Sequence, residues 1–353
     1  MTTPKIGPLD RPRTELAAVL HGPKDIRVEQ LARAELPAGH VRVALEATGL
    51  CGSDLHYYAD GRNGPNVVRA PLVLGHEGAG RVVEVGAGVE PELVGRRVAI
   101  EPAMVCGRCQ LCRAGRYNLC LHGTCLGSPP THGTLRQSVV MPRQNVHPVQ
   151  RLGAGTAALV EPLAVGTWAV QRAGIGLGDR VLITGAGPIG QLAATSARLA
   201  GASRIGIVDT APARLSSADG LADDYYDAVP TAPAEGAGAD VLLECSGAPE
   251  VLAELGALRP GARIALVGIP ARRPVAEDFL IMAQRYEYDV LGCFRYGPGA
   301  FAAAAALADS GRVDLQRLVT ATHPLADTAA ALHSALTDRS QLKTLVTSPG
   351  VQL

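Results

Sequence analysis

The stretch DRVLITGAGPIG, residues 179–190, decides the fold, because a short apolar run leads directly into a glycine-rich loop. Residues 179–184 are compact and aliphatic, which predicts a buried strand, and the Ala- and Leu-rich residues 189–199 predict a helix. Between them stands a G-x-G-x-x-G motif, whose glycines permit a tight turn and let backbone amides approach a pyrophosphate at the helix N-terminus. The residues predicted to hold a dinucleotide in this way are Gly185, Gly187, Pro188, Ile189 and Gly190.

Strands and helices alternate through the residues that follow this motif. Further helices are predicted from about Pro212 and over residues 249–258. Alternation of this kind predicts an α/β fold with a parallel, doubly wound sheet. The further strands are predicted at residues 205–208, 240–244, 262–267 and 290–293.

An acidic residue stands at the end of the second predicted strand. Asp209 follows Gly190 by nineteen residues, a position where a carboxylate can accept both hydroxyls of an adenosine ribose. The same carboxylate repels a 2′-phosphate, so the sequence favours NAD over NADP. Arg214, five residues further on, is a second candidate for contact with the ribose, with a solvated helix residue as the alternative interpretation.

The nicotinamide end of the dinucleotide is expected at the carboxyl edge of the later strands. Two segments end strands at this edge, although packing alone explains their apolar side chains equally well. The residues concerned are Val267, Gly268 and Ile269 in one segment, and Cys293 and Phe294 in the other.

The rest of the chain has a different pattern. Before the glycine motif it predicts short β elements, each close to a glycine or a proline. At 353 residues the chain exceeds the roughly 250–300 residues of a single core, so two domains are expected. The clearest early strands are residues 41–45, 80–85 and 97–100; after Gly299, helices are predicted at 301–309 and 327–336 and a strand at 344–347.

Composition excludes several classes of partner. The 33 Lys and Arg residues balance 33 Asp and Glu residues, so no basic excess attracts nucleic acid or an anionic membrane. No apolar run reaches the about 18 residues of a membrane span, and the polar stretch from Met1 to Leu16 lacks the apolar core of a signal peptide. We therefore expect a soluble, cytoplasmic protein that binds neither nucleic acid nor membranes.

Four of the eight cysteines fall within fifteen residues, with the spacing C-x2-C-x2-C-x7-C. Thiols this close in sequence seldom form independent disulfides, but they can surround a tetrahedral metal ion with sulfur bonds of roughly 2.3 Å. A closed four-thiolate site does no chemistry and holds together a surface loop that lacks a core of its own. The cluster consists of Cys106, Cys109, Cys112 and Cys120. No role is assigned to Cys125 or Cys245.

A second set of potential metal ligands is spread over three separate segments. Cys51 stands in CGSDLH, His76 and Glu77 stand together in GHEGAG, and Glu161 stands in VEP. A thiolate, an imidazole and one or two carboxylates can form an open zinc site that leaves one position for water or a substrate oxygen. Each residue alone is more often structural, and it is the set beside a dinucleotide fold that favours the metal site.

The sequence resembles the zinc-containing medium-chain dehydrogenases. GHEGAGRVVEVGAGV, residues 75–89, matches the zinc signature of that family, and the resemblance extends from Leu16 to Val346. Within the family the chain is most similar to the polyol branch of sorbitol, xylitol and L-idonate dehydrogenases. The segments that carry this closer resemblance are CGSDLHYY (51–58), IEPA (100–103), GSPPTHGTL (127–135), VEPLAVG (160–166) and GCFRYG (292–297).

The resemblance implies a particular division of the chain. Residues 1–163 and 300–353 would form a β-rich, chaperonin-10-like catalytic domain, with a structural zinc lobe at about residues 102–121. Residues 164–299 would form an inserted Rossmann domain that binds NAD. The family also implies a homotetramer or a homodimer, and the sequence does not choose between them.

The resemblance also implies roles for the metal ligands. Cys51, His76 and Glu77 would bind the catalytic zinc, and Glu161 occupies the place of a cysteine in simple alcohol dehydrogenases. The polyol branch has a glutamate there, which binds zinc directly or through water, so the choice between Glu77 and Glu161 stays open. The four clustered cysteines would hold a second, structural zinc, giving two zinc ions per subunit.

The same resemblance implies how a hydroxyl group is oxidised. Zinc stabilises the alkoxide, Ser53 accepts the proton, and His56 passes it towards solvent. Tyr57, Arg295 and Tyr296, together with Glu161, would contact the substrate; Arg295 also lies at the coenzyme edge.

We expect a zinc-dependent polyol:NAD oxidoreductase that converts a secondary alcohol to a ketose. The alternatives are an L-idonate 5-dehydrogenase, in which Arg295 pairs with the substrate carboxylate, and a threonine, glucose or simple alcohol dehydrogenase. A zinc-less NAD(P)H-binding sensor or structural protein is the non-enzymatic alternative, which the retained zinc ligands disfavour.

Overall fold

The computed structural model describes residues 14–230, 238–269 and 276–351. The stretch at 179–190 forms strand β13 (Arg180–Thr184), a tight loop and helix α5 (Pro188–Ala200). β13 lies inside a six-stranded sheet of order β15-β14-β13-β16-β17-β18, in which every neighbouring pair is parallel. The predicted parallel sheet is therefore confirmed. Its other strands are β14 (Arg204–Val208), β15 (Asp224–Tyr226), β16 (Ala239–Glu244), β17 (Leu258–Leu266) and β18 (Asp289–Gly292).

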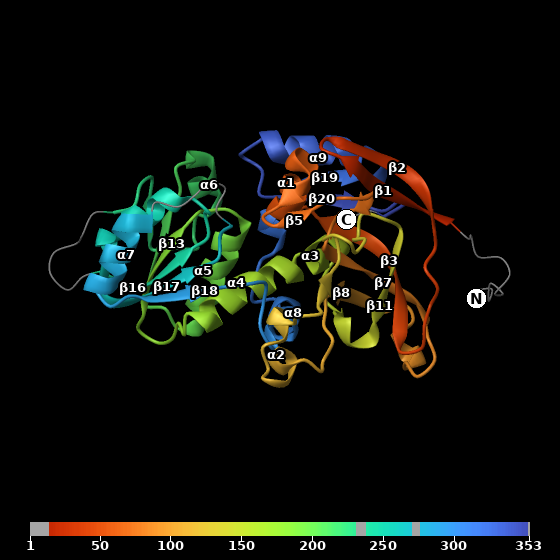
Figure 1. Ribbon diagram of the computed structural model, residues 1–353, viewed down its shortest axis with the longest axis horizontal. Coiled ribbons are helices and arrows are strands. Elements are labelled where there is room, and N and C mark those ends of the chain that lie inside the picture. Colours follow the sequence, from red (N-terminus) through yellow and green to blue (C-terminus); the bar gives the residue numbers. More distant parts are fainter. Residues whose placement is uncertain (1–13, 231–237, 270–275, 352–353) are drawn as a thin grey trace.

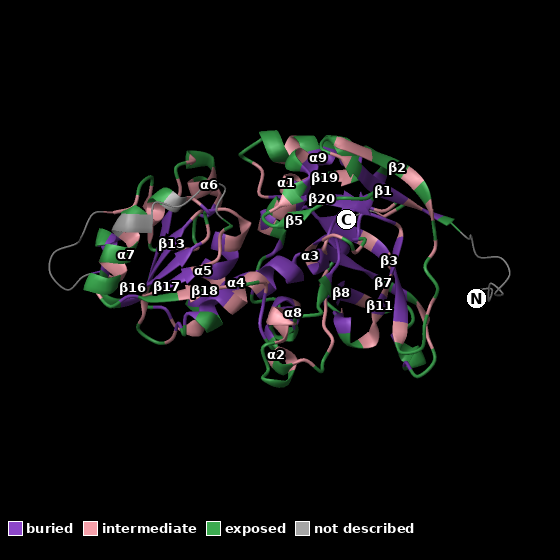
Figure 2. Cartoon of the chain, viewed as in Figure 1, coloured by how far each residue is buried: buried purple, intermediate pink, exposed green. Residues whose placement is uncertain are grey.

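Both faces of this sheet are covered, as the nearly continuous apolar strands require. Val181 and Ile183 of β13 pack with residues of α4 (Val160–Arg172) and α5, whereas Leu182 packs on the opposite face. Figure 2 shows these strands as the buried centre of one of two bodies, here named the parallel-sheet body. Its remaining helices are α6 (Pro212–Ser217) and α7 (Ala276–Arg285).

The stretch between β16 and β17 that was predicted to be helical contains 3-10 turns but no α-helix. The segment forms two short 3-10 helices, η4 (Pro249–Ala253) and η5 (Leu255–Ala257). Leu252 and Leu255 are three positions apart and pack into one cluster, which suits the three residues per turn of a 3-10 helix.

The other body, here named the β-rich body, is built around a seven-stranded sheet (Figure 1). Its order is β12-β8-β7-β3-β20-β19, and β11 also pairs with β3. A separate three-stranded sheet has the order β2-β1-β6. The strands are β1 (Thr14–Gly22), β2 (Asp25–Ala32), β3 (His40–Gly49), β6 (Leu72–Val73), β7 (Glu77–Val85), β8 (Arg97–Ile100), β11 (Ser138–Pro142), β12 (Val146–Pro148), β19 (Val319–Pro324) and β20 (Lys343–Thr347).

None of the helices in the described part of the chain combines the length and apolar character needed to cross a bilayer. Short helices and strands connect the strands of the β-rich body. The short elements are α1 (Gly52–Asp60), β4 (Arg62–Asn63), β5 (Asn66–Val67), η1 (Pro91–Leu93), β9 (Ala103–Met104), α2 (Gln110–Arg113), η2 (Tyr117–Leu119), β10 (Thr124–Cys125), η3 (Arg143–Asn145), α3 (Ala154–Ala158), η6 (Gln316–Leu318) and η7 (Leu325–Asp327).

The C-terminal part of the chain returns to the β-rich body (Figure 1). After the parallel sheet come α8 (Ala300–Asp309) and α9 (Thr328–Thr337), both close to their predicted positions. β20 then pairs antiparallel with β3, so that Leu345 lies opposite Gly49. Helix α4 packs against α5 on one side and α8 on the other, so the domain boundary predicted at residues 163 and 164 falls inside a helix that both bodies share. Residues 1–13 of the predicted first domain lie outside the described residues.

Candidate active site and metal centres

The turn from β3 into α1 places Cys51 at the edge of the β-rich body. Cys51 is the N-cap residue of α1, and its backbone amide donates a hydrogen bond to Asp54 Oδ2 at 3.0 Å. Strand β7 begins beside the end of β3, since Glu77 pairs with Gly49 in the sheet. The pairing of two strands therefore brings His76 and Glu77 next to Cys51.

The ligand atoms of Cys51, His76 and Glu77 lie within 4.8 Å of one another. Asp54, which is fully buried, accepts a hydrogen bond from the Gly75 amide at 3.0 Å and lies 3.6 Å from His76 Nδ1. A carboxylate in this place orients an imidazole whose other nitrogen binds a metal ion. Although burial opposes it, the negative charges of Asp54 and Cys51 raise the pKa of His76 well above its usual range.

Glu161 lies in the first turn of α4, outside that group of three ligand atoms. Its side chain is buried and makes no hydrogen bond within the described part of the chain. Burial raises the pKa of Glu161 to about 7, and the positive charges of His76, Lys343 and Arg295 act in the opposite direction. These interactions indicate that Glu161 shares the electrostatic environment of the metal-ligand group.

Lys343 is a site residue that the sequence analysis missed. Its side chain, almost completely buried in β20, donates hydrogen bonds to Glu77 Oε1 and, at 3.2 Å, to the carbonyl of Leu50. The other oxygen, Glu77 Oε2, is buried without a hydrogen-bond partner among the described residues. A Cβ atom at Gly49 would overlap this oxygen, so glycine leaves the room that the carboxylate occupies.

This donor set fits a zinc ion. Zinc accepts a thiolate, an imidazole nitrogen and carboxylate oxygens, and three protein ligands with an open position are typical of a catalytic site. Cys51, His76 and Glu77 supply those three kinds of donor, and the unpartnered Oε2 of Glu77 is a buried acceptor that a cation would satisfy.

The four clustered cysteines form a second metal-ligand group at the surface of the β-rich body, with all four sulfur atoms within 4.8 Å of one another. The distances from Cys106 Sγ to Cys112 Sγ and to Cys120 Sγ are 4.0 and 3.4 Å, and Cys109 Sγ lies 3.9 Å from Cys120 Sγ. A tetrahedron with zinc–sulfur bonds of roughly 2.3 Å has edges of about 3.8 Å, so the spacing fits a structural zinc. Backbone amides lower the pKa of Cys109 to about 6. None of the eight cysteines is in a disulfide.

The glycine loop at the start of α5 has the form that a dinucleotide needs. Gly185 has a φ of +92°, and Gly190 packs so closely on its carbonyl that a Cβ would overlap it. By contrast, a Cβ at Gly187 would meet nothing within 4 Å, which leaves the helix N-terminus open to a ligand. Asp209 reaches this loop, because its Oδ2 accepts a hydrogen bond from the Ala186 amide at 2.8 Å.

The other residues predicted to bind the coenzyme differ in their positions and in their burial. Val267 and Gly268 donate their amides to the carbonyl of Glu244 and so lie at the carboxyl edge of the parallel sheet. Cys293 follows β18 at the same edge. Arg214 is half-buried and donates a hydrogen bond to the carbonyl of Arg339 at 3.2 Å. Two further side chains at this edge are exposed, those of Ile269 and Phe294.

Tyr57 and Tyr296 are both buried. The Tyr296 hydroxyl has no hydrogen-bond partner among the described residues, whereas Ser128 and Asn66 lie beside the Tyr57 hydroxyl. Burial, together with the charge of Glu161, raises the pKa of Tyr296 well above its usual range, so the phenol stays protonated. Arg295, next in the chain, has a positive φ of 53° and stacks its guanidinium over Phe294 at 4.8 Å.

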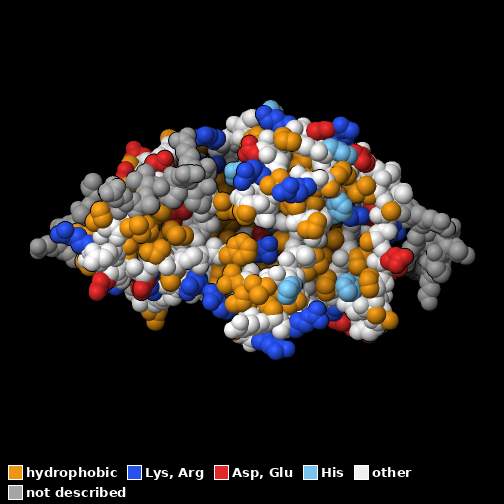
Figure 3. Space-filling view, viewed as in Figure 1, with side chains coloured by type: hydrophobic (Ala, Val, Ile, Leu, Met, Phe, Trp, Pro, Cys, Tyr) orange, Lys and Arg blue, Asp and Glu red, His pale blue; other side chains and the backbone are white. Residues whose placement is uncertain are grey.

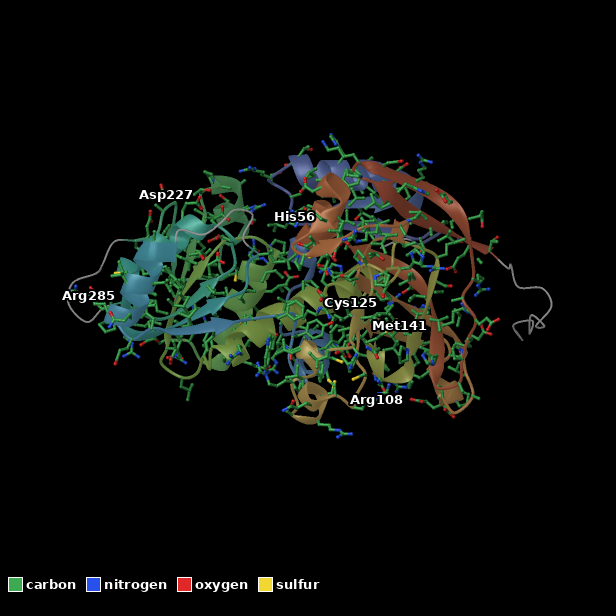
Figure 4. The ribbon with its side chains drawn as sticks, viewed as in Figure 1. His56, Arg108, Cys125, Met141, Asp227 and Arg285 are labelled. Atoms are coloured by element: carbon green, nitrogen blue, oxygen red, sulfur yellow. The ribbon has the colours of Figure 1, made fainter. Side chains whose placement is uncertain are left out.

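The two predicted proton-relay residues lie on the same helix. Ser53 is half-buried in the first turn of α1, and His56 follows it by three positions. The His56 side chain is 44% exposed, with its Nδ1 4.0 Å from Asp60 Oδ2. Figure 4 shows His56 on the side of the β-rich body that faces the parallel-sheet body. The helix therefore runs from the metal-ligand group towards solvent.

Of the two cysteines without a predicted role, Cys125 is buried and Cys245 is half-buried. Cys125 is 8% exposed, and burial raises the pKa of its thiol. Its charge interactions with Arg295, His76 and Glu161 place it near the candidate active site. Cys245 packs against the apolar core of the parallel sheet, and we assign it no chemistry.

Comparison with known proteins gives two family matches. The family described as "Alcohol dehydrogenase GroES-like domain" matches residues 37–151, and the one described as "Zinc-binding dehydrogenase" matches residues 188–310. The first falls on the β-rich body and the second largely on the parallel-sheet body. Together they confirm the predicted fold class.

Whole-chain comparisons agree with these matches. The chain is 35% identical over 347 residues to the sorbitol dehydrogenase of Bacillus subtilis strain 168, covering 95% of this chain and 98% of the relative. Its fold is similar to that of L-idonate 5-dehydrogenase from Escherichia coli K-12 MG1655, with a TM-score of 0.88, 29% identity and coverage of 95% and 98%. A Sinorhizobium meliloti 1021 protein bound to NADP gives a TM-score of 0.85 at 28% identity, with coverage of 95% and 99%.

Proposed function

Because this chain belongs to the zinc-containing medium-chain dehydrogenases, we propose that it oxidises a secondary hydroxyl of a polyol to a ketone, giving a ketose. The observation that carries the substrate class is the buried hydroxyl of Tyr296, which has no partner among the described residues. Burying a hydroxyl without a partner costs about 1–3 kcal/mol, so this group is suited to a ligand rich in hydroxyls. The names of the relatives, sorbitol and L-idonate dehydrogenases, point to the same class.

Cys51, His76 and Glu77 would hold the catalytic zinc, and Glu161 is a further carboxylate that would bind it directly or through water. A bound zinc ion supplies a Lewis acid that makes a substrate hydroxyl more acidic. Side chains of the protein must then carry the proton of this hydroxyl from the buried site to solvent. Ser53 and His56 are three positions apart on α1, which puts them on one helix face, and we assign them the relay from substrate to solvent.

The coenzyme is NAD in this proposal. The acidic Asp209 at the glycine loop would accept the ribose hydroxyls and disfavour the extra phosphate of NADP. We propose two zinc ions per chain, one at the group around Cys51 and one at the four cysteines. Metal analysis of the purified protein should therefore find two zinc ions per chain.

An NADH-production screen tests the substrate class. The candidates are sorbitol, xylitol, ribitol, galactitol, L-idonate, L-threonine and ethanol, each with NAD and with NADP. We expect a polyol to give the highest kcat/KM. A preference for L-idonate would favour the alternative in which Arg295 pairs with a carboxylate, and a preference for ethanol would contradict the proposed class.

Replacing Asp209 with glycine should lower the preference for NAD over NADP by about tenfold to a hundredfold, since about 1.4–2.8 kcal/mol of discrimination is removed. The ratio of kcat/KM for the two coenzymes measures this. Asp209→Asn is the matched variant, because it keeps an oxygen that can accept the Ala186 amide but removes the charge. An unchanged coenzyme ratio in both variants would remove Asp209 from the ribose.

We propose a homotetramer or a homodimer. Strand β18 is an edge strand of the parallel sheet, and an exposed apolar edge usually requires a cover. Figure 3 shows hydrophobic side chains gathered on the parallel-sheet body around α7 and β18. The exposed apolar residues there include Leu280, Ile281 and Val290.

The free cysteines support a reducing, cytoplasmic location.

A further inference from the structure

The geometry points to a positioning role for the four-cysteine lobe: Tyr117 and Asn118 hold the segment 293–297, here named the substrate loop, in the form that presents Arg295 and Tyr296 to the substrate. This inference rests on the proposed function, because it assigns those two side chains to the polyol. It gives the lobe a part in substrate recognition beyond holding its own residues together.

Two hydrogen bonds join the lobe to the substrate loop. η2 lies in the lobe immediately before Cys120, and from it the Asn118 amide group donates to the carbonyl of Phe294 at 3.1 Å. The Tyr117 hydroxyl donates to the carbonyl of Gly297 at 3.2 Å. These two carbonyls immediately precede and follow Arg295 and Tyr296, so the lobe fixes both ends of the pair.

The substrate loop needs such fixing because its backbone is not in a relaxed form. Arg295 has a φ of +53°, a left-handed conformation that costs a residue with a side chain about 1 kcal/mol or more. Gly297 lies directly on the Trp168 indole of α4, where any Cβ would overlap the ring. The loop is therefore held between α4, which also carries Glu161, and the lobe.

An open pocket of about 340 Å³ lies between the lobe, α4 and the loop. Asn118 and Phe294 both line this pocket, so the hydrogen bond between them joins the lobe to the loop at its edge. The residues that line the pocket include Arg116, Asn118, Leu119, Trp168, Arg172 and Phe294.

A buried carboxylate is a second acceptor for the Tyr117 hydroxyl, whose single proton is shared between Glu101 and the carbonyl of Gly297. Glu101 lies 3.4 Å from the Tyr117 hydroxyl, and its other oxygen bonds to His147 at 2.9 Å. The His147 ring packs on Phe301 at 4.7 Å, and Phe301 packs on Tyr296 at 5.5 Å. Burial and the charge of Glu101 raise the pKa of Tyr117 to about 12, so its hydroxyl remains a donor at neutral pH.

The test compares Tyr117→Phe and the double variant Tyr117→Phe/Asn118→Ala with the unchanged enzyme. With the best polyol from the screen, we expect KM to rise about fivefold in the single variant and about 25-fold in the double, with kcat within about twofold. Hydrogen–deuterium exchange of residues 293–297 should accelerate in the same order. Zinc content should stay at the value of the unchanged enzyme.

Leu121→Ala is the control, since this lobe side chain is 72% exposed and should change neither KM nor loop exchange. A purely structural lobe would lower thermal stability in the Tyr117 and Asn118 variants while leaving KM unchanged, and that result overturns the inference. Unchanged exchange in the loop overturns it as well. If no polyol is oxidised at all, the proposed function fails, and the exchange measurement alone still decides whether the lobe holds the loop.

Discussion

Turnover should fall by at least about a thousandfold when Cys51 is replaced with serine, which corresponds to ~4 kcal/mol of activation free energy. The reason is chemical, because a serine hydroxyl does not ionise near neutral pH and cannot replace a thiolate as a zinc ligand. NADH binding, followed by coenzyme fluorescence, should stay within about twofold, since the glycine loop and Asp209 belong to the other body.

Cys106→Ser is the matched control for this experiment. It makes the same chemical change in the other metal-ligand group, so each variant should lose one zinc ion per chain, but only Cys51→Ser should lose turnover. The lobe variant should keep kcat and raise KM. Loss of NADH binding in Cys51→Ser would mean that the metal site and the coenzyme site are not separable.

Removing the charge of Lys343 should have the largest effect on stability. In Lys343→Met the Glu77 carboxylate stays buried without its cation, and breaking a buried ion pair in this way costs about 3–5 kcal/mol. Urea unfolding of the metal-depleted protein measures this loss in free energy of unfolding. The metal is removed because a bound cation would itself compensate the charge of Glu77.

The double variant Lys343→Met/Glu77→Gln separates the ion pair from the loss of packing. Because it removes both charges, it should recover most of the stability that the single variant loses. Lys24→Met is the control, since Lys24 is exposed and is the other lysine in the described part of the chain. If Lys343→Met costs no more than Lys24→Met, the buried pair does not stabilise the fold.

The sequence predicted those features that depend on residues close together in the chain. The glycine loop, the alternation after it and the four cysteines are each visible within a short window, because the turn, the strand–helix rhythm and the metal spacing depend on near neighbours. Strand β19 was not predicted. Its six residues include only two aliphatic ones, Val319 and Ala321, and alternate between half-buried and exposed, which is a weak signal for an edge strand.

The rest of the site depends on contacts between distant residues, which one sequence does not reveal. Lys343 and Glu77 are 266 positions apart, and Tyr117 and Gly297 are 180 apart. One clue was present. The chain has 33 basic residues but only three lysines, and Lys343 is the one that stands inside an apolar strand sequence. A charged residue at such a position needs a buried partner, although its identity follows only from the fold.

The return of β20 to the β-rich body has a consequence for how the protein is made. The six described strands of the parallel sheet are all translated before residue 300, and domains generally fold in the order of their synthesis. The thiolate, imidazole and both carboxylates of the reaction centre are translated earlier still, yet the lysine that neutralises one of them arrives only with residue 343. In a nascent chain, the Glu77 carboxylate therefore has no Lys343 cation until β20 is added. A chain that ends before β20 should keep its parallel sheet but should not assemble the reaction centre.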